Sequence, residues 1–257
     1  ILRSALSLSA ITGKSVRIEQ IRAGRKKPGL MRQHFTCVQA AARICGATTS
    51  EISLGSETLD FFPGEISTVS AEFAIGTAGC TSLVLQTVLP ILLQAPEASQ
   101  LILRGGTHVQ GGPCFEYLDE VFLPRLRELG ASASIRLDLP GFFPAGGGSV
   151  FVEVSPSQLE AQFWNEPKGT LPVSAEVIDT PDIAATVSER ELAKVRRAFE
   201  IPPSDTWTRT VSGTLSPGNA VLLRAMVENG LGTIAFAFGQ RGKRCLLYTS
   251  PSPRDIG

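Results

Sequence analysis

The chain has 257 residues with 24 basic and 24 acidic side chains, so its formal net charge at neutral pH is zero. Hydrophobic residues make up 43% and charged residues 19%, which is typical of a globular protein with a substantial core. Balanced charge argues against a general polyanion binder, so any contact with nucleic acid should be confined to a patch. Five cysteines without metal-ligand or paired spacing favour a reducing, cytoplasmic compartment, and the apolar runs are too short to span a bilayer.

Hydrophobic periodicity predicts an alternation of helices and strands. The expected elements, in chain order, are helix 1–11, strand 15–21, helix 32–45, strands within 49–62, strand 65–73, helix 80–93, strand 100–103, helix 115–129, strand 133–139 and strand 149–154. Their order is β-α-β-α-β-β, occurring about twice without obvious sequence identity, with the first strand of the first copy missing. We therefore expect an α/β (α+β) fold whose large domain, residues 1–163, holds two such units.

The composition becomes more polar after Pro156, which indicates a second unit. A strand over 172–178, a helix over 188–199 and strands over 219–228 and 232–238 predict a small inserted α/β domain within residues 164–244. Ser188 followed by Glu191 has the spacing of a capping box and predicts the start of the helix.

Both ends of the chain suggest a fragment of a longer protein. The sequence begins with Ile1 inside a helical pattern, so we expect a strand or loop before it. Residues 245–255 resemble the translation of a sequencing adapter, and we interpret 245–257 as a non-native tail. A natural Ser/Pro-rich tail is the alternative.

The segment from Ile21 to His34 concentrates cations between two apolar segments. These cations are Arg22, Arg25, Lys26, Lys27 and Arg32. Guanidinium groups suit phosphate oxygens because they offer paired donors in a rigid fork. Gly24 and Gly29 permit close backbone approach or a positive φ, and the helix that follows would direct free N–H groups at an anion. A phosphate-binding loop is one interpretation, and a solvated basic loop is the other.

Two glycine-rich segments are further candidates. Gly76, Thr77 and Gly79 open the helix over 80–93, where backbone N–H groups can hold an anion, although N-capping by Thr77 or Thr81 explains the pattern equally well. Gln86 lies within an apolar helix, so it either faces solvent or binds a ligand. A third group, Gly146, Gly147 and Gly148, favours a tight connection between strands, with more glycines than a hairpin needs.

Nucleophilic side chains are few. His34 and His108 have no carboxylate or hydroxyl partner at a telling spacing, so we expect a structural role for each. Cys80 stands at an expected helix N-terminus, which would lower the pKa of its thiol, yet we interpret it as a small buried residue.

Together these segments resemble the RNA 3′-terminal phosphate cyclase family. The resemblance rests on residues 1–8, 21–34, 76–79 with 85–86, 104–107 and 141–148, in order and at family-like spacing. The basic string in 22–34 and the Pro-x-Gly-Gly-Gly string in 144–148 are its specific parts, whereas residues 157–244 match loosely.

The resemblance implies ATP-dependent conversion of an RNA 3′-terminal phosphate to a 2′,3′-cyclic phosphate, a ligase-type nucleotidyl transfer that passes through an adenylylated histidine. It implies ATP and a divalent metal (Mg or Mn) as cofactors and RNA 3′-phosphate ends as partners. On this analogy ATP or its phosphates are bound by Arg3, Arg22, Arg25 and Gln86. The RNA end or its supporting loops would involve Arg32, Gly76, Thr77, Gly79, Gly146, Gly147 and Gly148.

The family's metal-binding glutamate would precede Ile1, and its nucleophilic histidine would lie beyond the natural sequence present. The resemblance therefore implies no catalytic or metal-binding residue in this chain and no turnover by the chain alone.

Several positions depart from the family pattern. Cys80 replaces a serine, Pro140 replaces a basic residue, and residues 108–110 replace acidic and amide residues. The changes at residues 108–110 concern RNA-end contacts more than nucleotide binding. The alternative function is a non-catalytic, cyclase-like scaffold for RNA processing or ribosome biogenesis; an enolpyruvyl transferase shares only the architecture.

Overall fold

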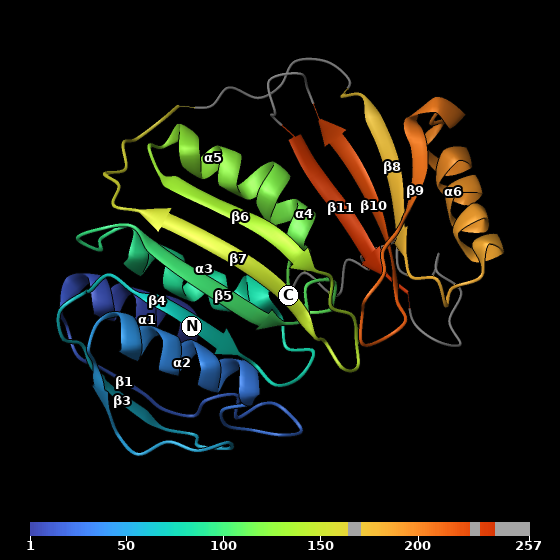
Figure 1. The fold of residues 1–257 in the computed structure, drawn as a ribbon. Helices are drawn as coiled ribbons and strands as arrows, with labels where there is room; N and C mark the ends of the chain where they lie inside the picture. Colours follow the sequence, from blue (N-terminus) through green and yellow to red (C-terminus); the bar gives the residue numbers. More distant parts are fainter. Residues whose placement is uncertain (164–170, 227–231, 240–257) are drawn as a thin grey trace.

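The computed structural model describes residues 1–163, 171–226 and 232–239. Within these ranges the strands form one three-stranded and two four-stranded sheets (Figure 1). Helices lie between the first two sheets and against both faces of the third.

The complete repeat unit contains the central sheet. Its elements are β4 (Ser70–Ala74), α3 (Thr81–Leu92), β5 (Ser99–Gly105), α4 (Phe115–Tyr117), a π-helical turn (Leu118–Phe122), α5 (Leu123–Glu128), β6 (Ser132–Leu139) and β7 (Gly148–Ser155). The strand order is β4-β5-β7-β6, with β4 parallel to β5 and the other pairs antiparallel. This is the expected β-α-β-α-β-β order, with the predicted helix over 115–129 divided into three pieces.

The preceding unit repeats the same plan from its first helix onward. Its elements are α1 (Leu2–Thr12), β1 (Val16–Ile18), α2 (Arg32–Ile44), β2 (Thr48–Thr49) and β3 (Leu59–Phe62). Its strand order, β1-β3-β2, matches the order β5-β7-β6 of the second unit. The α/β class and the repeated unit predicted from the sequence are therefore confirmed.

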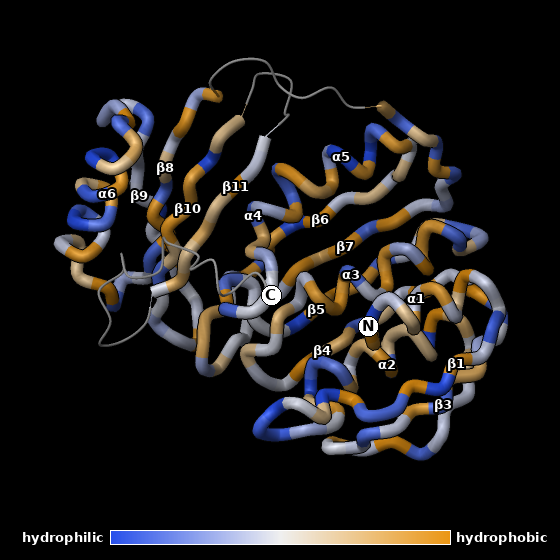
Figure 2. The backbone as a smooth tube through the Cα atoms, turned by 180° about the vertical axis from the view of Figure 1, so that it is seen from behind, coloured by the Kyte–Doolittle hydropathy of each residue, from blue (hydrophilic) through white to orange (hydrophobic). Residues whose placement is uncertain are grey.

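Strict alternation of side chains fixes which face of the central sheet is buried. Leu101 and Leu103 on β5 and Val150, Val152 and Val154 on β7 are buried and belong to the main core. The opposite face carries polar contacts such as Gln100 Nε2 to Glu153 Oε1 at 2.9 Å. The tube in Figure 2 shows the hydrophobic residues gathered along these strands and α3. The apolar face therefore holds α1, α2 and α3 in place, with their N-termini near the site described below.

The third sheet belongs to the more polar part of the chain. Its elements are β8 (Val173–Asp179), α6 (Ala185–Phe199), a 3₁₀ turn (Pro203–Asp205), β9 (Thr206–Thr210), β10 (Asn219–Met226) and β11 (Gly232–Phe238). The order is β11-β10-β8-β9; β8 and β9 are parallel, and the pairs β11–β10 and β10–β8 are antiparallel. Helix α6 covers one face, and Cys114, Val121 and Phe142 pack against the other.

Some details differ from the sequence predictions. Strand β9 was not expected, and β1 and β4 are shorter than the predicted 15–21 and 65–73. Ser188 does not begin α6 but lies in its first turns, where its hydroxyl donates to Asp179 Oδ2 at 2.5 Å, while Glu191 accepts from Asn219. The capping-box prediction is therefore wrong. The boundaries at residues 163 and 244 stay predictions, and the expected tail over 245–257 lies outside the described residues.

Among the described residues, we find no helix with the length and apolar character needed to cross a membrane.

The core position of α3 generates a stability prediction. Replacing Leu89, which is 2% exposed, by alanine (Leu89→Ala) should lower the free energy of unfolding by about 2–5 kcal/mol, because buried methyl groups are lost and a cavity remains. Leu8→Ala on α1 is the matched control, because Leu8 is 61% exposed, and it should change stability by less than about 0.5 kcal/mol. Urea denaturation measures both, and equal losses would contradict the assigned core.

Candidate functional site

The first element of the candidate site is a contact between α1 and α3. Arg3 Nε donates to Gln86 Oε1 at 3.0 Å, although the two residues are 83 positions apart in the sequence. Gln86 is exposed. An exposed amide can face solvent or bind a ligand, so this position is compatible with both interpretations of Gln86. The other guanidinium nitrogens of Arg3 and the amide nitrogen of Gln86 have no partner within the described chain. They remain available to a ligand.

The second element is the basic loop before α2. Its base is closed by Gly29 N donating to Ile21 O at 2.7 Å, and Arg22 Nη1 donates to the carbonyls of Lys27 and Gly29 at 2.7 and 3.0 Å. Gly29 has φ +76° and lies directly on Gly55, where a Cβ would come within 2.1 Å of a carbonyl oxygen. Arg22 thus fixes the loop with one end of its guanidinium and keeps the other donors free. This structural role was not foreseen from the sequence.

The third element is the Gly76–Gly79 loop between β4 and α3, which meets the first turn of α2. Gln33 Oε1 accepts from Cys80 N at 2.8 Å, and a Cβ on Gly76 would lie 3.4 Å from Arg32 Nη1. Gln33 is a site residue that the sequence analysis did not select. Its position beside Arg32 in the basic string was the available signal.

The N-capping alternative for this loop is wrong. Helix α3 has Cys80 as its N-cap and no side-chain cap. Thr77 Oγ1 instead accepts from Gly79 N at 3.3 Å, and Thr81 Oγ1 donates to Gly106 O at 3.0 Å. The hydroxyl groups therefore shape the loop rather than end the helix.

The fourth element is the Gly141–Gly148 turn between β6 and β7. Gly146 has φ +74°, and a Cβ there would lie 2.7 Å from Thr77 O and 2.8 Å from Ala78 Cα. The turn therefore rests directly on the Gly76–Gly79 loop. A Cβ on Gly147 would collide with Leu215, and one on Gly148 with Gly141 N. As expected, these glycines make a tight connection between strands, and they also bring it against a second loop.

The electrostatic character of the site is cationic. Within the described ranges Arg3, Arg22, Arg25 and Arg32 form no ion pair, whereas Arg17, Arg104 and Arg136 pair with carboxylates. Burial lowers the pKa of His34, and the charges of Arg22 and Arg3 lower it further. His34 Nδ1 is buried and has no hydrogen-bond partner within the described part of the chain. Positive charge is therefore concentrated here without compensation from nearby carboxylates.

Two sequence expectations about reactive groups need correction. The pKa of the Cys80 thiol is raised, not lowered, because the side chain is buried, with Sγ 2.7 Å from Ser82 Oγ. Cys80 is thus a buried residue, as we expected. His108 does have a carboxylate partner, since its Nε2 lies 2.8 Å from Glu116 Oε2. The spacing of eight residues across a loop gave no signal for this pair.

Metal-binding groups do not assemble in the described ranges: no three His, Cys, Asp or Glu side chains there are placed to hold an ion. The residues present do fit an anionic phosphate group. Arg32 Nη1 lies beside Gly76, and the charges of Arg22 and Arg3 act on His34 in the first turn of α2, so cationic groups lie close to the Gly76–Gly79 loop.

Comparisons with known proteins agree on one family. A family model described as RNA 3′-terminal phosphate cyclase matches residues 1–236. A protein of Pseudomonas fluorescens named RNA 3′-terminal phosphate cyclase is 42% identical over 244 residues, which cover 95% of this chain and 71% of the relative. Proteins of the same name from Ectopseudomonas mendocina and Koribacter versatilis are 43% and 38% identical, covering 71% and 68% of their own lengths and 95% and 94% of this chain.

The environment of His34 gives a test of anion binding. A bound sulfate dianion should offset the charges of Arg3 and Arg22, so the pKa of His34 should rise from its lowered value when sulfate is added. NMR titration of the imidazole signals with and without sulfate measures this change. A His34 pKa that is unaffected by saturating sulfate would contradict an anion site at this position.

Proposed function

Because this chain belongs to the RNA 3′-terminal phosphate cyclase family, we propose that it binds ATP and serves the ATP-dependent conversion of an RNA 3′-terminal phosphate to a 2′,3′-cyclic phosphate. The reaction proposed is a ligase-type nucleotidyl transfer through a covalent enzyme–AMP intermediate. The observation that carries the proposal is the grouping of cations around the N-terminus of α2: the charges of Arg22 and Arg3 act on His34, Arg3 donates to Gln86, and Arg32 lies beside Gly76.

Elementary phosphate chemistry explains why such a site is needed. A terminal phosphate is a poor electrophile until one of its oxygens becomes part of a good leaving group, which transfer of an adenylyl group achieves. Negative charge gathers during each transfer, and fixed cations and N–H donors stabilise it. Cations without carboxylate partners can supply this stabilisation without first breaking internal ion pairs.

We assign roles by the donors that remain free. Arg3 and Gln86 would contact ATP together, because each holds the other in place and keeps unused donors. Arg22 and Arg25 would contact phosphates from the basic loop. The remaining predicted positions, Arg32 and the glycine-rich loops, would receive the RNA end or support the nucleotide contacts.

Neither described histidine is proposed as the nucleophile. His108 is 2% exposed, and its two ring nitrogens lie 2.8 Å from Thr107 Oγ1 and Glu116 Oε2. His34 lies between arginines and is assigned to phosphate contact. The adenylylated histidine and the ligands of a divalent metal (Mg or Mn) would come from other parts of the complete protein.

We also propose that the reaction belongs to cytoplasmic RNA processing. Free thiols at Cys37, Cys45, Cys80 and Cys114 support a reducing compartment.

Nucleotide binding provides the first test. Arg3→Met and Gln86→Leu should each weaken ATP binding by about tenfold or more, because a hydrogen bond to a charged group contributes about 1.5–3 kcal/mol. Arg136→Met is the matched control: Arg136 lies on β6 and pairs with Asp138 at 2.7 Å, so ATP affinity should not change. Isothermal titration calorimetry measures the three dissociation constants. Equal effects in all three variants would count against the assigned contacts.

Covalent chemistry provides the second test. The complete gene product, incubated with ATP labelled in the α-phosphate, should form a labelled protein adduct and convert an oligoribonucleotide 3′-phosphate to the cyclic product. Arg3→Met should lower the yield of both, because the same phosphate contacts serve binding and transfer. A complete protein that neither binds ATP nor forms the adduct would instead be the non-catalytic RNA-processing scaffold.

A further inference from the structure

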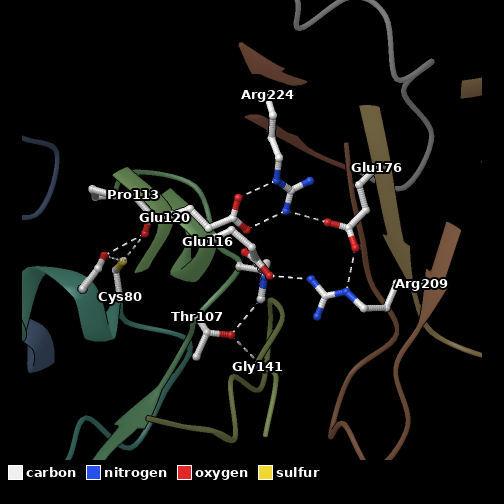
Figure 3. A network of polar contacts seen from close by, with 11 residues as sticks. Cys80, Thr107, Pro113, Glu116, Glu120, Gly141, Glu176, Arg209 and Arg224 are labelled. Carbon is white, nitrogen blue, oxygen red and sulfur yellow. Dashed lines mark hydrogen bonds and ion pairs between the residues drawn. The ribbon is translucent and has the colours of Figure 1, made fainter. Parts of the chain in front are cut away.

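A polar network joins the third sheet to α4 and the π-helical turn beside the central sheet (Figure 3). Arg209 on β9 donates through Nε to Glu176 Oε1 and through Nη2 to Glu116 Oε1, both at 2.7 Å. Arg224 on β10 donates to both oxygens of Glu120 at 2.6 and 2.8 Å and to Glu176 Oε2 at 2.8 Å. The two arginines share Glu176, but only Arg209 reaches Glu116.

Glu116 continues the network toward the candidate site. Its second oxygen, Oε2, lies 2.8 Å from His108 Nε2, and His108 Nδ1 lies 2.8 Å from Thr107 Oγ1. Thr107 Oγ1 also accepts from Gly141 N at 2.9 Å. Thr107, His108 and Glu116 are 2%, 2% and 4% exposed, so water does not compete for these bonds.

The direction of each bond follows from the available protons. Thr107 has one hydroxyl proton and can give it to His108 Nδ1 while accepting from Gly141. His108 Nε2–H then donates to Glu116. Burial alone would raise the pKa of Glu116, but the hydrogen bonds that it accepts from His108 and from Arg209 hold this pKa well below its usual range. Glu116 is thus a carboxylate that depends on both partners.

The backbone carries the network from Thr107 into the Gly76–Gly79 loop. Gly106 N donates to Gly79 O at 2.8 Å, and Gly106 O accepts from Thr81 N at 2.9 Å. Thr107 N donates to Gly141 O at 2.9 Å, which anchors the start of the turn that rests on Thr77. An uninterrupted series of contacts therefore runs from Arg209 to both sides of the loop.

We propose that Arg209 is a positioning residue for the Gly76–Gly79 loop, acting through Glu116, His108 and Thr107. The third sheet then has a part in the site although Arg209 does not itself touch the loop. Removing Arg209 leaves Glu116 buried with one partner, so Glu116 must take up water or turn away, and His108 and Thr107 lose their fixed positions.

Arg224 is the matched control. It lies on the same sheet, shares Glu176 and is more buried than Arg209, with side chains 12% and 40% exposed. Arg224→Met therefore removes at least as much of the network as Arg209→Met, but leaves the bonds of Glu116 intact. A general loss of stability should therefore appear in both variants, whereas the loss of a positioning role should appear in Arg209→Met alone.

Hydrogen exchange measured by mass spectrometry tests the proposal directly. In Arg209→Met, peptides covering 76–82 and 105–112 should exchange about tenfold faster than in the wild type, since the amides of Gly106 and Thr81 lose their fixed acceptors. Arg209→Lys should restore part of the protection, because it keeps the charge but cannot bridge both carboxylates as a fork does. Arg224→Met should leave these peptides unchanged and accelerate exchange in β10.

ATP affinity supplies the functional readout, and this part alone rests on the proposed function. Arg209→Met should weaken ATP binding by about fivefold, and Arg224→Met should leave it unchanged. A wild-type protein that fails to bind ATP would overturn the proposed function, while the exchange comparison would still decide the positioning role.

Two outcomes would overturn the inference. One is equal exchange in the loop peptides of Arg209→Met and Arg224→Met; the other is loop exchange in Arg209→Met that matches the wild type. If Arg209→Met does not fold, Glu116→Gln and Arg209→Lys decide the question, because both keep a polar group at the same place. Wild-type loop exchange in both of these would also reject the proposal.

Discussion

The site depends on a steric constraint, which is backbone packed directly on backbone where three loops meet. A Cβ on Gly106 would lie 2.6 Å from Ala78 O, and one on Gly146 would lie 2.7 Å from Thr77 O. Real Cβ atoms do not approach so closely, so only glycine permits these loops to touch. This contact sets the Gly76–Gly79 loop between the Gly106 strand end and the Gly141–Gly148 turn. The N-terminus of α3 then faces that of α2, where Gln33 completes the junction through Cys80 N.

Cations gathered without carboxylates repel one another, so the fold must hold them by other means. Arg22 is fixed by carbonyls of its own loop, and Arg3 by the neutral amide of Gln86. Neutral acceptors hold a guanidinium in position without cancelling its charge. This arrangement preserves the attraction for an anion, and it means that a bound anion should stabilise the folded protein by mass action.

Hydrophobic patterning made most of the fold predictable, because α2 and the strands β5 and β7 each bury one regular face, whereas α3 is a continuous apolar run that is buried on nearly all sides. Strand β9 was missed because Thr206–Thr210 follows two prolines and has no apolar alternation; it exists because it pairs with β8. In the candidate site, the cations and glycines were visible in the sequence. Which of them meet was not, because the Arg3–Gln86 and Gln33–Cys80 contacts join distant segments. The pairing of His108 with Glu116 was hidden for a different reason: the two residues are only eight positions apart, but an irregular loop, which has no periodicity to read, brings them together.

Arginine side chains serve opposite purposes in the third sheet and in the candidate site. Arg209 and Arg224 pair with carboxylates of β8 and of the helical segment 115–122, so their charge holds this segment against the third sheet and is not available to a ligand. Arg3, Arg25 and Arg32 have no carboxylate within reach among the described residues, so their charge acts outward. The net charge of zero does not reveal this difference between paired and unpaired arginines, because Glu116, Glu120 and Glu176 all lie beside Arg209 and Arg224. The distribution of carboxylates, more than the number of arginines, therefore determines where an anion can bind. It also explains why the network and the cationic loops can be neighbours without neutralising each other: His108 and Thr107, which are not carboxylates, separate Glu116 from the Gly76–Gly79 loop.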